Sequence, residues 1–186
     1  MSDATNVRVA VTGAVLKGLT SATAPTGTAG APVGFNDLGF ISEDGVEIEL
    51  PDAGDSTPIK AWQNATTVRI IRTPSDDNPT WKFTLLETSI AVVETYFGVT
   101  VTSVVAEGSF EFKSSTLRPF DSYIVDVIDG AELIRDYVPR GIVTSVGSHK
   151  LSNGDPIGYE VTVEGELDPA LDYNFTRWAT ALKTPA

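Results

Sequence analysis

Apolar and polar residues alternate with a period of two along much of the chain. At residues 159–164 (Tyr-Glu-Val-Thr-Val-Glu) every second side chain is apolar, which is typical of a strand that buries one face. The same alternation recurs at residues 7–12, 46–50, 81–85, 109–113 and 123–128, and more weakly at 67–72 and 142–146. The pattern therefore predicts a mainly β protein.

Glycine-containing pairs lie between several of these segments. They are Asp44-Gly45, Asp129-Gly130 and Asn153-Gly154. Such pairs suit the positive φ angles of two-residue hairpin turns. The pairs predict that neighbouring strands run antiparallel.

One segment has helical periodicity instead. Thr88 can cap a helix, and Gly98 stands where that helix would stop. Between them, Ile90, Val93 and Phe97 fall on one apolar stripe, which predicts one helix of about three turns. Because β-branched residues lower its helix propensity, we expect the stripe to pack against a sheet as part of the core.

Length and composition favour one globular domain spanning residues 1–186. Residues 18–34 and 51–58 are rich in Gly, Pro, Thr, Ala and Asp and predict two long loops. We expect an N-terminal strand and flexible arm at residues 1–34 and a C-terminal arm at 166–186. Loops of this length make sense where a neighbouring subunit orders them.

The charge and the cysteine count exclude several classes of protein. The chain has 25 acidic and 13 basic residues, a formal charge of −12, which argues against tight binding of nucleic acid. It contains no cysteine, so disulfides, thiol nucleophiles and cysteine-ligated zinc are excluded. No stretch approaches the roughly 18 apolar residues of a membrane span, and we expect no membrane partner.

The candidate catalytic and metal-binding residues are isolated. His149 is the single histidine, it has no Gly-x-Ser-x-Gly partner motif, and we interpret it as a solvated turn residue. Asp52 and Asp55 resemble part of a calcium loop but lack its order of ligands. We therefore expect no catalytic, cofactor-binding or metal-binding residue, no cofactor and no enzymatic activity.

Two pairs of glutamates share strand faces. Glu47 and Glu49, like Glu160 and Glu164, are separated by even numbers and project from the same face of their strands. Paired carboxylates can hydrolyse glycosides, but a polar row facing solvent is the better interpretation. Such a row would give a negative field to any channel that it lined.

Residues 37–46 (Asp-Leu-Gly-Phe-Ile-Ser-Glu-Asp-Gly-Val) are followed in order by 60–63, 67–73, 81–87 and the helix at 88–98. Together these segments resemble major tail tube proteins of long, non-contractile bacteriophage tails. The likeness covers most of residues 36–165. It is a likeness of the whole pattern and not of a chemical motif.

The resemblance implies the phage tail-tube fold, a β-sandwich or barrel flanked by one α-helix, with a long loop and an N-terminal arm. It implies a structural virion protein whose hexameric rings stack into the tube through which DNA passes during ejection. The implied partners are further copies of the chain, the tape-measure protein, the tail terminator and tail-tip proteins, with double-stranded DNA as cargo that is not bound. The tube would be assembled in the host cytoplasm.

This scheme assigns two groups of residues. A lysine or arginine in the lumen would bind the phosphates of DNA and slow its passage, so we expect the lumen to be lined by acidic residues. The residues expected there are Glu47, Glu49, Glu160 and Glu164. Asp52, Asp55, Pro58 and Trp62 are expected in a loop that reaches the adjacent ring.

Two other classes remain open at this stage. One is a virion-displayed or secreted β-sandwich that binds carbohydrate or a host surface, although Trp62, Trp81 and Trp178 are scattered along the chain. The other is the related ring protein of bacterial contractile secretion systems. The hairpin expected at residues 39–46 favours phage tails.

Overall fold

The computed structural model describes residues 7–183 of the chain. Its elements are β1 (Thr12–Leu19), β2 (Phe35–Asp37), β3 (Ile41–Glu49), β4 (Ser56–Lys60), β5 (Thr67–Arg72), β6 (Thr80–Leu85), α1 (Ile90–Phe97), β7 (Thr102–Ser103), β8 (Gly108–Ser109), β9 (Asp121–Asp129), β10 (Glu132–Val146), β11 (Tyr159–Gly165), β12 (Thr176–Ala179) and the 3-10 turn η2 (Thr180–Leu182). Strand makes up 44% of the structure and helix 6%, so the predicted mainly β fold with one α-helix is confirmed.

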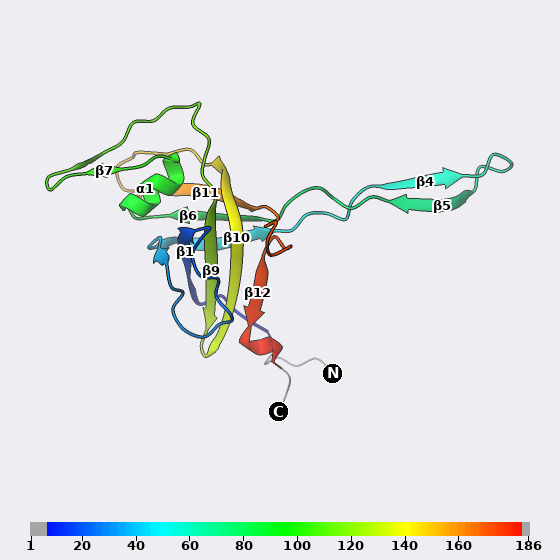
Figure 1. Cartoon of the computed structure of the whole chain (residues 1–186), viewed down its shortest axis with the longest axis horizontal. Helices are drawn as coiled ribbons and strands as arrows, with labels where there is room; N and C mark the ends of the chain where they lie inside the picture. Colours follow the sequence, from blue (N-terminus) through cyan, green and yellow to red (C-terminus); the bar gives the residue numbers. More distant parts are fainter. Residues whose placement is uncertain (1–6, 184–186) are drawn as a thin grey trace.

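One open, antiparallel sheet forms the body, in the order β2-β1-β9-β10-β11-β6-β3, with β12 paired to β10. β10 belongs to both halves of this sheet: its first part pairs with β9, and its last part, from Gly141, pairs with β11. The register shifts between Val138 and Gly141. The sheet folds over at this point, and β9 crosses β6 and β11 at a steep angle in Figure 1.

Gly141 permits the fold because the two halves approach closely there. A Cβ atom at this position would lie 2.6 Å from the ring of Tyr123 and 3.0 Å from Val163. The core fills the space between the halves. Buried side chains of both halves meet there: Val15, Tyr123, Val125 and Val138 from one half, and Trp81, Phe83, Leu85, Tyr159, Val161 and Val163 from the other. Alternation in β6 and β11 places these apolar residues inward, as predicted.

The helix is confirmed, but its start and its buried face differ from the prediction. Ser89, not Thr88, is the N-cap, and its hydroxyl accepts a hydrogen bond from the Val92 amide. Gly98 ends the helix in the left-handed conformation, as predicted. The eight-residue helix buries Val92, Thr95 and Tyr96, whereas Ile90 is exposed. The sheet covers a face rotated from the predicted stripe because the helix lies across β10 and β11.

Three strand predictions need correction. The strand predicted at residues 7–12 begins only at Thr12, and that predicted at 109–113 is reduced to Gly108–Ser109. The Asp44-Gly45 pair is no hairpin turn, because Gly45 (φ 71°) lies within β3, where the register against β6 shifts. The Asp129-Gly130 turn is confirmed between β9 and β10.

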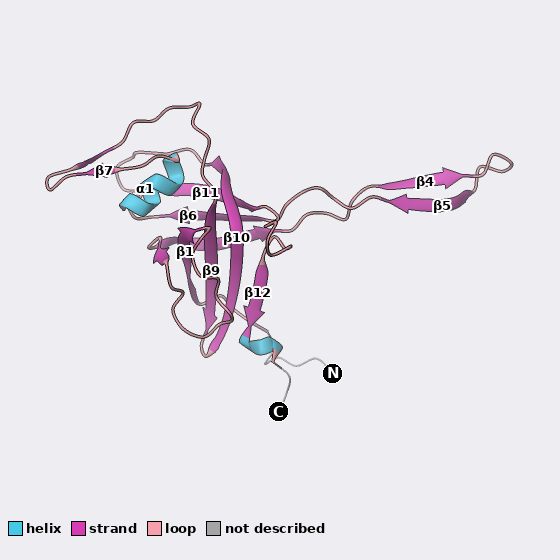
Figure 2. Ribbon diagram, viewed as in Figure 1, coloured by secondary structure: helices cyan, strands magenta, loops and turns pink. Residues whose placement is uncertain are grey.

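The irregular segments contain more structure than predicted. The loop expected at residues 51–58 runs into β4, which pairs with β5 in a two-stranded sheet that extends away from the body (Figure 2). The C-terminal arm expected at 166–186 contains β12. In the expected N-terminal arm, β1 continues to Leu19 before irregular backbone begins. Residues 1–6 and 184–186 of these arms lie outside the described residues.

Candidate functional site

The four glutamates expected to line a lumen lie on one face of the sheet. In the strand register, Glu47 of β3 is opposite Lys82 of β6, and Glu160 of β11 is opposite Thr84. Glu49 and Glu164 both pair with Thr80, from opposite sides. Side chains on directly paired residues share a face, so β3, β6 and β11 bring the four carboxylates together. We call this surface the acidic face.

Few partners neutralise the acidic face. Lys82 Nζ lies 3.4 Å from Glu160 Oε1, and Asn78 Nδ2 donates a hydrogen bond of 2.8 Å to Glu164 Oε1. Glu47 and Glu49 are exposed and form no ion pair within residues 7–183. With four carboxylates against one ammonium group, this face is negative, while the opposite face of the same strands builds the core.

The residues expected in an inter-ring loop belong to the β4–β5 hairpin and its stalk. Pro58 pairs with Ile70, and Trp62 lies in the turn with 97% of its surface exposed. Asp52 and Asp55 lie in the stalk, which is closed by a 2.9 Å hydrogen bond from the Thr73 amide to the Asp55 carbonyl. Figure 1 shows the hairpin reaching far beyond the main sheet.

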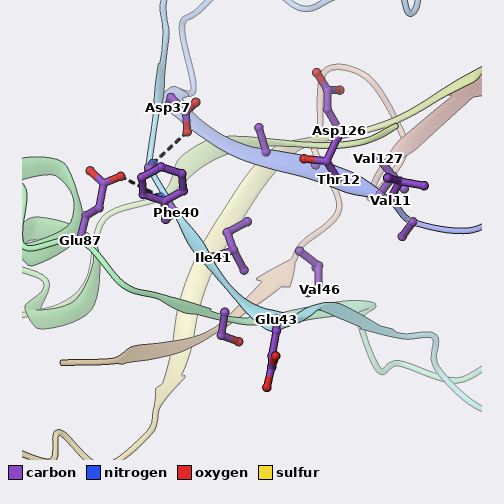
Figure 3. A pocket seen from close by; sticks show the side chains of 16 residues that line it. Val11, Thr12, Asp37, Phe40, Ile41, Glu43, Val46, Glu87, Asp126 and Val127 are labelled. Atoms are coloured by element: carbon purple, nitrogen blue, oxygen red, sulfur yellow. Dashed lines mark hydrogen bonds between the residues drawn. The ribbon is translucent and has the colours of Figure 1, made fainter. Parts of the chain in front are cut away.

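A groove between β1 and β3 was not predicted from the sequence. It has a volume of about 530 Å³ and is lined by residues 10–14 on the β1 side and by residues 39–43, 45 and 46 on the β3 side (Figure 3). Two carboxylates shape its wall: Asp37 Oδ1 accepts from the Gly39 amide at 2.8 Å, and Glu87 Oε1 accepts from the Phe40 amide at 2.9 Å. The Asp37-x-Gly39 turn is the local signal that could have indicated this wall, but the opposing strand comes from a distant part of the chain.

Two ion pairs, each with a buried side chain on β10, hold the outer strands and the arm to the body. Asp136 accepts two hydrogen bonds of 2.6 Å from Arg177 of β12, which raise the pKa of that guanidinium. Arg135 donates two bonds of 2.7 Å to Asp126, which raise its pKa likewise, and two of 3.2 Å to the carbonyls of Gly27 and Gly30. These contacts stabilise the fold, and each of the four charges is paired.

His149 is not a solvated turn residue, which corrects the prediction. It is half-buried, and its ring centroid lies 4.8 Å from that of Tyr159, 5.6 Å from Tyr96 and 6.1 Å from Phe97. Its ring neighbours are therefore aromatic, and within residues 7–183 its buried Nδ1 has no hydrogen-bond partner, so neither a serine nor a carboxylate is bonded to that atom as a catalytic partner would be. In the part of the chain that the structure describes, no cluster of His, Cys, Asp or Glu could hold a metal ion, and no helix is long and apolar enough to cross a membrane.

Among the described residues the sheet has unpaired edges, one face is negatively charged and a hairpin projects from the body, and these features are typical of a structural subunit that assembles with others. The comparison with known families agrees: the chain matches the phage tail tube protein family over residues 1–179 and belongs to that family. No match was found among curated proteins. The chain is thus a structural virion component that self-assembles into a tail tube and interacts with other tail proteins.

Proposed function

We propose that six copies of the chain close into a ring, that rings stack into the tail tube, and that DNA passes through it without being bound during ejection. The open edges of the sheet carry this proposal. β3 has β6 as neighbour on one side only, and β10 beyond Gly141 pairs only with β11 among the described strands. Pairing β3 of one copy with residues 142–146 of the next would satisfy these backbone groups and continue the sheet around the ring.

In this ring the acidic face lines the lumen. Glu47, Glu49, Glu160 and Glu164 would repel the phosphates of DNA, and Lys82 is already held near Glu160. A lysine or arginine free to contact phosphate would exchange counterions for a protein contact and slow the DNA. The same lumen would hold the tape-measure protein before ejection.

The remaining segments join subunits. The hairpin with Asp52, Asp55, Pro58 and Trp62 reaches the adjacent ring. Residues 7–34 and 166–183 are anchored on their own body through β1 and β12, and their outer surfaces contact neighbouring copies of this single tail-tube domain. Tail terminator and tail-tip proteins close the two ends of the tube. Assembly takes place in the host cytoplasm, and the family role as a structural protein supports the absence of enzymatic activity.

Expression of the chain alone tests this proposal. Size-exclusion chromatography and negative-stain electron microscopy should give rings or hollow tubes of uniform diameter, with six-fold symmetry in end views. A chain that stays monomeric at high concentration, or a monomer that binds a glycan, would contradict it.

A further inference from the structure

The β4–β5 hairpin has a charge opposite to that of the rest of the chain. Between residues 56 and 72 the ionisable residues are Lys60, Arg69 and Arg72, with no carboxylate, in a chain of net charge −12. In the described structure none of the three forms an ion pair. The hairpin therefore presents three unpaired cations far from the acidic body.

The same hairpin exposes apolar side chains and backbone edges. Ile59, Trp62, Val68, Ile70 and Ile71 are all exposed. Both strands pair only with each other, so each outer edge has no strand neighbour among the described residues. A small apolar sheet with two open edges is not stable on its own in water, and we expect a second surface to cover it.

The β1–β3 groove has the matching charge. Asp37, Glu43 and Glu87 line it and form no ion pair within residues 7–183, whereas Asp126 is neutralised by Arg135. No lysine or arginine is among the residues that line it. In Figure 3, Glu43 extends from β3 at the rim, on the side away from β1.

The groove also offers apolar contacts and open strand edges. Val11 and Phe40 are exposed at its wall, beside the half-buried Ile41 and Val46. β2 pairs with β1 only at Leu16 to Gly18, so residues 12–14 have β9 as their one strand neighbour. The first part of β3 likewise has a strand neighbour on one side. An added strand could pair with either edge, in the mode by which extended segments join sheets.

We infer that the β4–β5 hairpin of one copy docks in the β1–β3 groove of a second copy. Three unpaired cations meet three unpaired carboxylates, exposed apolar surfaces cover each other, and strand edges pair. The hairpin does not reach the groove of its own copy, because it extends away from the body (Figure 1). This inference rests on the proposed tube, in which the second copy belongs to the adjacent ring. The docked hairpin would use only the first part of the β3 edge, so the edge beyond Val46 stays available for ring closure.

Two charge-reversed chains test the docking. The hairpin variant is Lys60→Glu/Arg69→Glu/Arg72→Glu, and the groove variant is Ala10→Lys/Thr12→Lys/Glu43→Lys, which sets three lysines against the remaining Asp37 and Glu87. All six substituted residues are exposed, so each variant should unfold at the wild-type denaturant midpoint. Each alone should reduce the fraction of protein that pellets as tubes by at least tenfold. An equimolar mixture should recover pelleting, because each hairpin then finds a groove of opposite charge on the other variant.

The control variants are Lys113→Glu and Glu107→Lys, exposed charges outside both surfaces, which should pellet as wild type does. Wild-type tubes with unaffected reversal variants would overturn the docking while leaving the tube proposal intact. Loss in each variant without recovery in the mixture would also overturn it and assign the groove to another occupant. A wild-type chain that never forms tubes would contradict both proposals.

Discussion

At the scale of single residues, burial decides which charges matter. The side chain of Asp136 is 3% exposed, whereas that of its partner Arg177 is 43% exposed. Trp81 Nε1 also donates to Asp136, at 3.4 Å, so the carboxylate connects the core with β12. Removing the arginine would leave a buried charge without its partner, which costs more than losing an exposed pair.

We predict that Arg177→Ala lowers the free energy of unfolding by about 2–3 kcal/mol, discounted for the partial exposure of the arginine. Lys150→Ala, which removes the exposed Lys150–Asp155 pair, should cost less than about 0.5 kcal/mol. Urea unfolding of the two variants measures the difference. Equal losses would show that the Asp136 pair contributes nothing beyond a surface contact.

Residue placement was predictable only where it follows strand periodicity. The period of two predicts that Glu47 and Glu49 project from the same face of their strand, and the structure agrees. That both pairs share a face depends on the register of β3 and β11 against β6, which no local pattern encodes. His149 was misplaced for the same reason, because its aromatic neighbours come from α1 and β11.

At the scale of elements, the helix end was the most predictable boundary. Gly98 has a φ of 67°, a conformation that is unfavourable for any residue with a Cβ atom. A Cβ atom there would also lie 3.1 Å from the Arg118 side chain.

We predict that Gly98→Ala lowers the free energy of unfolding by about 1 kcal/mol. Gly27→Ala is the control: it lacks positive φ and close neighbours and should stay within about 0.5 kcal/mol of wild type. A neutral Gly98→Ala, measured by thermal or urea unfolding, would contradict this account of the cap.

Elements that break the alternation were missed. β10 was predicted only at residues 142–146, because Arg135, Asp136 and Pro139 interrupt its apolar pattern although all three are buried. The charges of Arg135 and Asp136 are paired with Asp126 and Arg177, and the spacing of residues in the sequence does not reveal these pairs. β4 contains Pro58, which lowers strand propensity but is tolerated in a two-stranded sheet at an edge.

The hairpin should be separable from the fold. Because β4 and β5 pair only with each other and Asp55 and Thr73 are already joined at the stalk, a short Gly-Ser linker can replace residues 56–72. We predict an unchanged unfolding midpoint and loss of long tubes, with isolated rings at most. Circular dichroism measures the unfolding midpoint, and electron microscopy measures the length of the tubes. Tubes of wild-type length from this variant would show that the hairpin does not join rings.

At the scale of the whole molecule, the acidic face and the open edges have one explanation in common. Beyond Gly141 the strand order is β10-β11-β6-β3, so β3 and the last residues of β10 each have one strand neighbour among the described residues, and in the proposed ring identical copies pair these two edges. In the proposed ring, this pairing places the acidic face of β3, β6 and β11 toward the lumen in every copy. The hollow interior and its negative charge are then properties of the proposed assembly, because no single copy encloses a channel.

The most direct measurement is a cryo-electron microscopy reconstruction of tubes assembled from the purified chain. The account predicts six copies in each ring, β3 of one copy paired with the end of β10 of the next, and Glu47, Glu49, Glu160 and Glu164 on the inner wall. A reconstruction with these carboxylates on the outer wall, or with β3 unpaired between subunits, would contradict it.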